Sequence, residues 1–183
     1  MIDLNMSKEM LKIHISSIKA VTEDTFTDVV GDFAVINCAE RKNNFLTANP
    51  PALLLQLSFA DITNENDPNC FSLEHGKEIR AFYESLPPSV TDLFIFCDAG
   101  ESRSTAIAAA ILLAGGRSDA PVWSNPFYHP NTFVFGRLCQ AFGMKMTEAQ
   151  IAEKKRQSED AFRSAMKNGT HFQRWEVISA DEC

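Results

Sequence analysis

The sequence predicts an α/β fold in which a central, mainly parallel sheet is flanked by helices. Short apolar runs of strand type alternate with helical patterns, and three of these runs are close to continuously apolar, as strands covered on both faces tend to be. One helical pattern is apolar nearly all round, which is typical of a helix in the centre of a domain. At 183 residues the chain suits one domain, so we expect residues 1–183 to fold as a unit.

Four strands are expected where apolar runs lie between turn-forming residues. Ligands of open parallel sheets bind beyond the carboxyl ends of the strands. Cys97 lies at such an end, so its strand is the first place to look for a site. The expected strands run from Lys12 to Ile15, Phe33 to Asn37, Leu53 to Phe59 and Leu93 to Cys97.

Four helices are expected from their capping and stop signals. Ser72 and Asn131 are side chains that cap helix starts, and Thr147 with Gln150 forms a capping box. The stretches 43–51 and 118–130 are rich in turn-forming residues and are interpreted as loops. The expected helices run from Ser72 to about Leu86, Arg103 to Ala114, Asn131 to Phe142 and Thr147 to about Asn168.

Composition excludes several classes of partner. The chain carries 17 basic and 24 acidic residues, for a net charge of −7, so we expect neither nucleic acid nor a membrane surface as a partner. The start of the chain lacks the apolar segment of a secretory signal, and the 5 cysteines show no close CxxC spacing. Both features favour a cytoplasmic protein with free thiols. The 4 histidines show no metal-ligand spacing, and we expect neither metal nor cofactor.

The stretch FCDAGESRST, residues 96–105, joins a strand end to a helix start through a tight loop. Such a loop points several backbone N–H groups into one concavity, with the positive end of the helix dipole behind them. A phosphate fits this arrangement. Gly100 lets the backbone turn without a side chain in the way. The residues expected to bind the phosphate are Asp98, Ala99, Gly100, Glu101, Ser102 and Arg103.

Three side chains of this stretch suit nucleophilic catalysis on a phosphoester. The dipoles that bind phosphate would also stabilise a thiolate at Cys97, which is the nucleophilic form of the residue. Arg103, at the first position of the helix, presents a planar fork of donors that matches two phosphoryl oxygens. Ser104 places a hydroxyl within reach of the sulfur, where a donor helps the thiolate to leave.

The pattern Cys97-x5-Arg103-Ser104 resembles the signature loop of the cysteine-based protein tyrosine phosphatases, closest to the compact dual-specificity type and its bacterial relatives. The similarity spans roughly residues 30–143 by the order of elements. It implies a protein tyrosine phosphatase-like fold and a two-step reaction through a cysteinyl-phosphate. It also implies an aspartic acid that acts as general acid, on a loop before the cysteine.

Asp61 is the candidate for that acid. It ends the segment LSFAD, which follows a predicted strand, and it precedes Cys97 by 36 positions (97 minus 61). It would protonate the leaving oxygen and later activate water. Asp67 lies on the same loop and is the main alternative, with Glu65 a weaker one.

Two departures from the family pattern leave other functions open. Phe96 stands where the family often has His, and Asp98 and Glu101 would repel highly phosphorylated ligands. We therefore expect hydrolysis of phosphotyrosine first, and of phosphoserine or phosphothreonine second, in a phosphorylated protein or a small phosphoester. One alternative is a catalytically weak module that only binds phosphorylated residues. Another is a thiol redox enzyme such as an arsenate reductase, which would need a second cysteine near the loop.

Neighbouring residues carry weaker hypotheses. Cys38 follows another strand end and could form a disulfide with Cys97, although a buried structural thiol is the favoured interpretation. Residues 40–42 follow the same strand and either border the pocket or form a solvated loop. The aromatic residues Trp123, Phe127 and Tyr128 either wall the substrate site or pack onto their own domain.

Overall fold

The computed structural model describes residues 10–21, 26, 29–40, 50–168 and 177–178. No helix in this part of the chain is long and apolar enough to cross a membrane. The strands are β1 (Lys12–Ser17), β2 (Asp32–Asn37), β3 (Leu53–Gln56), β4 (Val90–Cys97) and β5 (Val177–Ile178). The helices are the 3-10 turn η1 (Ile18–Ala20), α2 (Leu73–Glu84), α3 (Arg103–Ala114), α4 (Ala120–Ser124), α5 (Thr132–Ala141) and α6 (Glu148–Asn168).

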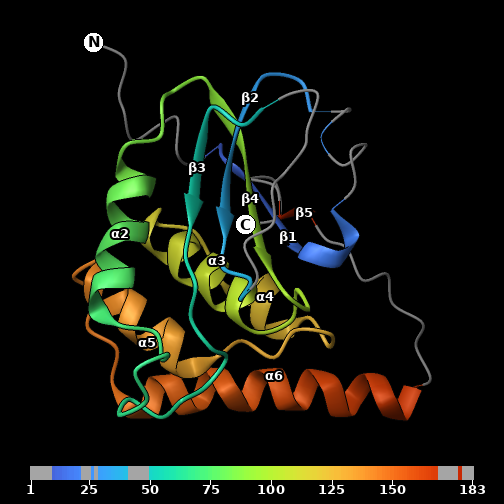
Figure 1. The fold of residues 1–183 in the computed structure, drawn as a ribbon. Helices are drawn as coiled ribbons and strands as arrows, with labels where there is room; N and C mark the ends of the chain where they lie inside the picture. The colour runs from blue at the N-terminus through green and yellow to red at the C-terminus, as the bar shows by residue number, and fades with distance from the viewer. Residues whose placement is uncertain (1–9, 22–25, 27–28, 41–49, 169–176, 179–183) are drawn as a thin grey trace.

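The described strands form one sheet in the order β3-β2-β4-β1-β5 (Figure 1). The pairs β3 with β2, β2 with β4 and β4 with β1 are all parallel, and only the short β5 runs antiparallel, against β1. This confirms the predicted mainly parallel sheet. Asn37 of β2 pairs with Phe96 of β4, so the next residues, Cys38 and Cys97, lie at adjacent strand ends.

Side-chain alternation along β4 sends successive residues to opposite faces of the sheet. Leu93, Ile95 and Cys97 belong to the large core cluster beneath the helices. Phe94 and Phe96 belong to a smaller cluster on the other face, with Phe26 and Phe33 among its members. Phe96 therefore packs away from the sulfur of Cys97, and its apolar ring is used in a second core.

Helix α3 lies at the centre of the helical layer. Its residues Arg103 to Leu112 are all buried, and it contacts β4 and β1 on one side and α4 and α5 on the other. A helix covered on all sides needs no polar face, which explains why its sequence is apolar nearly all round. It ends at Gly115 as predicted, and its first turn carries the only charged side chain of the helix, Arg103.

The predicted helix starts are confirmed by their capping contacts. The hydroxyl of Ser72 accepts a hydrogen bond from the backbone N–H of His75, whose ring accepts from the N–H of Ser72. Thr147 and Gln150 bond each other reciprocally at the start of α6. On the exposed side of α6, Arg156 pairs with Glu153 three residues earlier.

Two predictions about local structure are wrong. The third strand ends at Gln56 rather than at Phe59, and it is an edge strand whose side chains are alternately exposed, so it is not covered on both faces. The stretch 118–130, interpreted as a loop, contains the short helix α4. A proline in the first turn of a helix loses no hydrogen bond, and the buried carboxylate of Asp119 accepts hydrogen bonds from Trp123 and Lys154, which hold this turn.

Candidate functional site

Cys97 lies at the carboxyl end of β4 and is buried, with 1% of its surface exposed. Its sulfur accepts a hydrogen bond from the backbone N–H of Gly100 at 3.1 Å. The hydroxyl of Ser104, in the first turn of α3, lies 3.1 Å from the same sulfur. The loop and the helix start therefore place two hydrogen-bonding groups on one sulfur atom.

Gly100 gives the loop a shape that other residues would adopt only with strain. Its φ is +75°, in the left-handed region that favours glycine. A Cβ at this position would also lie 2.6 Å from the backbone nitrogen of Ser17, at the end of β1. The loop can therefore pack against β1 only with glycine here, and this packing helps to fix the position of Cys97.

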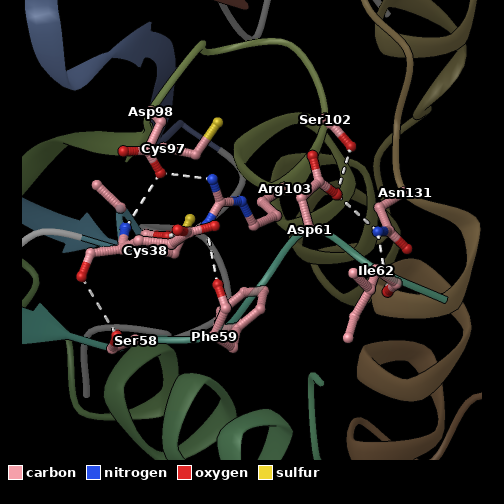
Figure 2. A network of polar contacts seen from close by, with 12 residues as sticks. Cys38, Ser58, Phe59, Asp61, Ile62, Cys97, Asp98, Ser102, Arg103 and Asn131 are labelled. Carbon is pink, nitrogen blue, oxygen red and sulfur yellow. Dashed lines mark hydrogen bonds and ion pairs between the residues drawn. The ribbon is translucent and has the colours of Figure 1, made fainter. Parts of the chain in front are cut away.

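Arg103 is 4% exposed, and its guanidinium is held from several sides (Figure 2). Nη1 donates to the carbonyl oxygens of Cys38 at 3.2 Å and of Phe59 at 2.8 Å. Nη2 donates to the carboxylate of Asp98, within the same loop. Nε is buried and has no hydrogen-bond partner among the described residues. A buried cation with one unpaired donor beside a strand end is suited to receive an anion.

Two carboxylates border this guanidinium. Asp98 accepts from Arg103 and from the backbone N–H of Glu40, and the side chain of Glu40 lies 3.6 Å from Nη1. Burial alone would raise the pKa of Asp98, but the hydrogen bonds from Glu40 and Arg103 outweigh it and hold that pKa below its ordinary value. Glu40 therefore does border the site, while residues 41 and 42 lie outside the described residues.

Cys38 is the cysteine that lies beside Cys97. It is fully buried, and its thiol donates to the carbonyl oxygen of Phe96 at 2.9 Å. Burial, and then the charge of the neighbouring Cys97, raise the pKa of the Cys38 thiol well above its ordinary value. Cys38 is thus held as a neutral thiol, in keeping with the favoured interpretation of a buried structural residue.

Asp61 follows β3 and reaches the loop between Cys97 and α3. Its Oδ1 accepts a hydrogen bond from the hydroxyl of Ser102 at 2.9 Å and from the amide of Asn131 at 2.7 Å, as Figure 2 shows. The two alternatives are engaged elsewhere. Asp67 accepts from the backbone and amide of Asn69, and Glu65 pairs with Arg137 on α5. Of the three candidate acids, Asp61 alone bonds the loop that carries Cys97.

Asn131, predicted from the sequence only as a helix cap, also contacts Asp61. Its capping role is confirmed, since Oδ1 accepts from the N–H groups of Phe133 and Val134. Its contact with Asp61 spans 70 positions of sequence, so no local pattern could have found it.

A cleft of about 280 Å³ lies beside these residues, and its lining includes Ser102, Asn131 and Lys155 of α6. In Figure 1 the arrowheads of β2 and β3 point toward the α6 side of the molecule.

The aromatic residues of 123–128 pack onto their own domain. Trp123 is 1% exposed, and its indole N–H donates to Asp119 while its ring packs edge to face on Phe135. Tyr128 is 2% exposed. Both rings therefore pack onto their own domain, and Trp123 is at the same time one of the residues that line the cleft beside Asn131.

Comparisons with known proteins agree with the architecture. No protein-family model and no curated protein sequence matches the chain. The solved structure of DUSP15 matches with a TM-score of 0.50 at 19% identity, over 82% of this chain and 92% of that one. The structure of human DUSP28 matches with a TM-score of 0.47 at 18% identity, over 83% of this chain and 94% of that one. The chain therefore has the fold of the cysteine-based protein tyrosine phosphatases, in its compact dual-specificity form.

Proposed function

We propose that the protein is a cysteine-dependent phosphatase that hydrolyses phosphotyrosine, and phosphoserine or phosphothreonine to a lesser extent, without a cofactor. The observation that carries this proposal is the guanidinium of Arg103. It is almost fully buried, two of its nitrogens are fixed by Cys38, Phe59 and Asp98, and its Nε has no partner among the described residues. A phosphoryl oxygen on Nε would satisfy this donor.

In the first step the thiolate of Cys97 attacks phosphorus. The S–P bond forms while the bond from phosphorus to the leaving oxygen breaks, and Asp61 gives its proton to that oxygen. Arg103 and the N–H groups of the loop stabilise the negative charge of the transition state. The hydrogen bond from Gly100 already lies on the sulfur, so the nucleophile needs little rearrangement.

In the second step water releases the phosphate. Asp61, now a carboxylate, takes a proton from the water as the water oxygen attacks phosphorus, and the S–P bond breaks. Ser104 donates to the departing sulfur, which its position 3.1 Å away supports. The products are inorganic phosphate, the free thiolate and a protonated Asp61, so the enzyme is ready for another cycle.

The charges around the loop bear on the substrate. The carboxylates of Asp98 and Glu40 already compensate Arg103, and Glu101 adds a further acid to the loop. A phosphomonoester is accommodated by the loop N–H groups, whereas several phosphates on one ring would meet these acids. The cleft beside Ser102 and Asn131 offers space for the chain that continues from the phosphorylated residue.

The test is a comparison of substrates under reducing conditions. We expect hydrolysis of para-nitrophenyl phosphate and of a phosphotyrosine peptide, a slower reaction with the matching phosphoserine peptide, and competitive inhibition by vanadate. Binding of the phosphotyrosine peptide with no release of phosphate would instead select a binding module. Thiol-dependent reduction of arsenate without phosphatase turnover would select a redox enzyme.

A further inference from the structure

Every polar atom of the Asn131 side chain is engaged. The residue is 7% exposed, and its Oδ1 accepts from the backbone N–H groups of Phe133 at 3.0 Å and Val134 at 3.1 Å. Its Nδ2 donates to Oδ1 of Asp61 at 2.7 Å and to the carbonyl oxygen of Ile62 at 3.3 Å. One side chain therefore joins the start of α5 to the segment that carries the candidate acid.

The amide of Asn131 can make these contacts in one orientation only. The first N–H groups of α5 are donors, so they require the amide oxygen, and this turns the NH₂ group toward the carboxylate of Asp61 and the carbonyl of Ile62. A reversed amide would place donor against donor at the helix and acceptor against acceptor at Asp61. The capping role thus fixes which group faces Asp61.

The orientation of the Asp61 side chain depends on the groups that bond its carboxylate. It is exposed and lies outside regular secondary structure. Its Oδ1 takes the bonds from Ser102 and Asn131, and among the described residues no group donates to Oδ2. Oδ2 is therefore the oxygen that carries the transferred proton, and its direction is set by what holds Oδ1.

We propose that Asn131 is a positioning residue for general acid catalysis, holding Oδ1 of Asp61 so that Oδ2 faces the leaving oxygen. The inference rests on the proposed function and deepens it. In the first step the proton leaves Oδ2 as the bond from phosphorus to the leaving oxygen breaks. The negative charge that develops on the carboxylate is then shared with Oδ1, where the amide N–H of Asn131 and the hydroxyl of Ser102 stabilise it.

The test uses two substrates that differ in their need for a proton. Phenyl phosphate has a poor leaving group that depends on general acid catalysis, whereas para-nitrophenyl phosphate has a better one that depends on it less. Asn131→Ser keeps a helix cap and removes the amide donor without adding charge, and Asn131→Asp keeps the cap and the shape. Asn125→Ser is the matched control. Asn125 is also buried, and it also accepts a backbone N–H through Oδ1, but its partner is Phe127.

For both Asn131 variants we expect kcat on phenyl phosphate to fall roughly 10- to 100-fold, and kcat on para-nitrophenyl phosphate to fall several times less. Asn125→Ser should change both substrates equally and little. Equal losses on the two substrates in the Asn131 variants would overturn the inference and leave the phosphatase standing. If the natural chain hydrolyses neither substrate, the proposed function is overturned and this inference with it. Thermal unfolding of each variant verifies that the cap is retained.

Discussion

A cysteine lies at the carboxyl end of each of two adjacent parallel strands, yet the surroundings of the two thiols are opposite. Cys38 after β2 and Cys97 at the end of β4 are both buried. The thiol of Cys38 donates its hydrogen to the carbonyl oxygen of Phe96, and burial raises its pKa. The sulfur of Cys97 instead accepts from the N–H of Gly100 and lies against the hydroxyl of Ser104.

Burial therefore does not distinguish a structural thiol from a candidate nucleophile. The difference lies in the stretch of chain that comes after each cysteine. Beyond Cys97 the chain turns at Gly100 and begins the buried helix α3, which supplies donors and the positive end of a helix dipole. The backbone carbonyl of Cys38 serves the same site in another way, since it holds Arg103.

The largest expected effect comes from replacing Cys97 by serine, and the same replacement at Cys38 is the matched comparison. Cys97→Ser should lower kcat on para-nitrophenyl phosphate by at least roughly 10³-fold, because a serine hydroxyl at this place has no base to activate it. Cys38→Ser keeps a donor for the carbonyl of Phe96 and should retain activity within about 10-fold. Similar losses in both variants would contradict the distinction between the two cysteines.

The next largest effect concerns Asp61, the candidate acid that bonds the loop after Cys97. Asp61→Asn should lower kcat roughly 10²- to 10⁴-fold, since the leaving oxygen then departs without a proton. The matched variant Asp67→Asn changes an acid on the same segment whose carboxylate bonds its neighbour Asn69, and it should leave kcat nearly unchanged. A larger loss in Asp67→Asn than in Asp61→Asn would reverse the assignment of the acid.

Arg103 links the two strand ends, and its replacement tests that link. Arg103→Lys keeps the positive charge but loses the planar fork, so it cannot serve the carbonyls of Cys38 and Phe59 and a phosphoryl oxygen together. We expect kcat/KM to fall roughly 10²- to 10³-fold and vanadate to bind more weakly. Arg137→Lys, at an arginine of α5 that pairs with Glu65, is the control. Unchanged vanadate binding in Arg103→Lys would contradict the anion site.

The smallest effect is on stability and depends on pH. The folded-state pKa of Asp98 is lowered, so its carboxylate stabilises the fold above its unfolded pKa, and that contribution is lost as pH falls through the folded pKa. Because the side chain is 37% exposed, the contribution is about 1 kcal/mol. The free energies of unfolding of the natural chain and of Asp98→Asn, measured in urea, should differ at neutral pH. The difference should shrink as pH falls below about 4. A difference that stays constant with pH would contradict this role.

The sequence predicted what depends on neighbouring residues. Helix α3 has the predicted bounds because its start adjoins the loop and its end is a glycine, and Cys97, Arg103 and Ser104 come together because they share that loop. The general position of Asp61 came from the family resemblance. The helix and the loop each depend on a short stretch of chain.

What the sequence did not predict arises from contacts between distant segments. The edge position of β3 depends on strand order, which no single strand records. The second role of Asn131 depends on a contact with a residue 70 positions away. The contact between the Asp98 carboxylate and Arg103 was not predicted either, and it forms because the loop turns the two side chains toward each other. The strand β5 is too short to show a pattern of its own and forms only by pairing with β1.

The most direct test of the central claim is to find where the phosphoryl group goes. The natural chain would be mixed with an excess of para-nitrophenyl phosphate, quenched in acid within a turnover, digested, and its cysteine-containing peptides analysed by mass spectrometry. We predict one phosphoryl group on the peptide that contains Cys97 and none on the peptide that contains Cys38. A phosphoryl group on Cys38 would contradict the account. So would a burst of the first product during turnover if every cysteine-containing peptide stays unmodified.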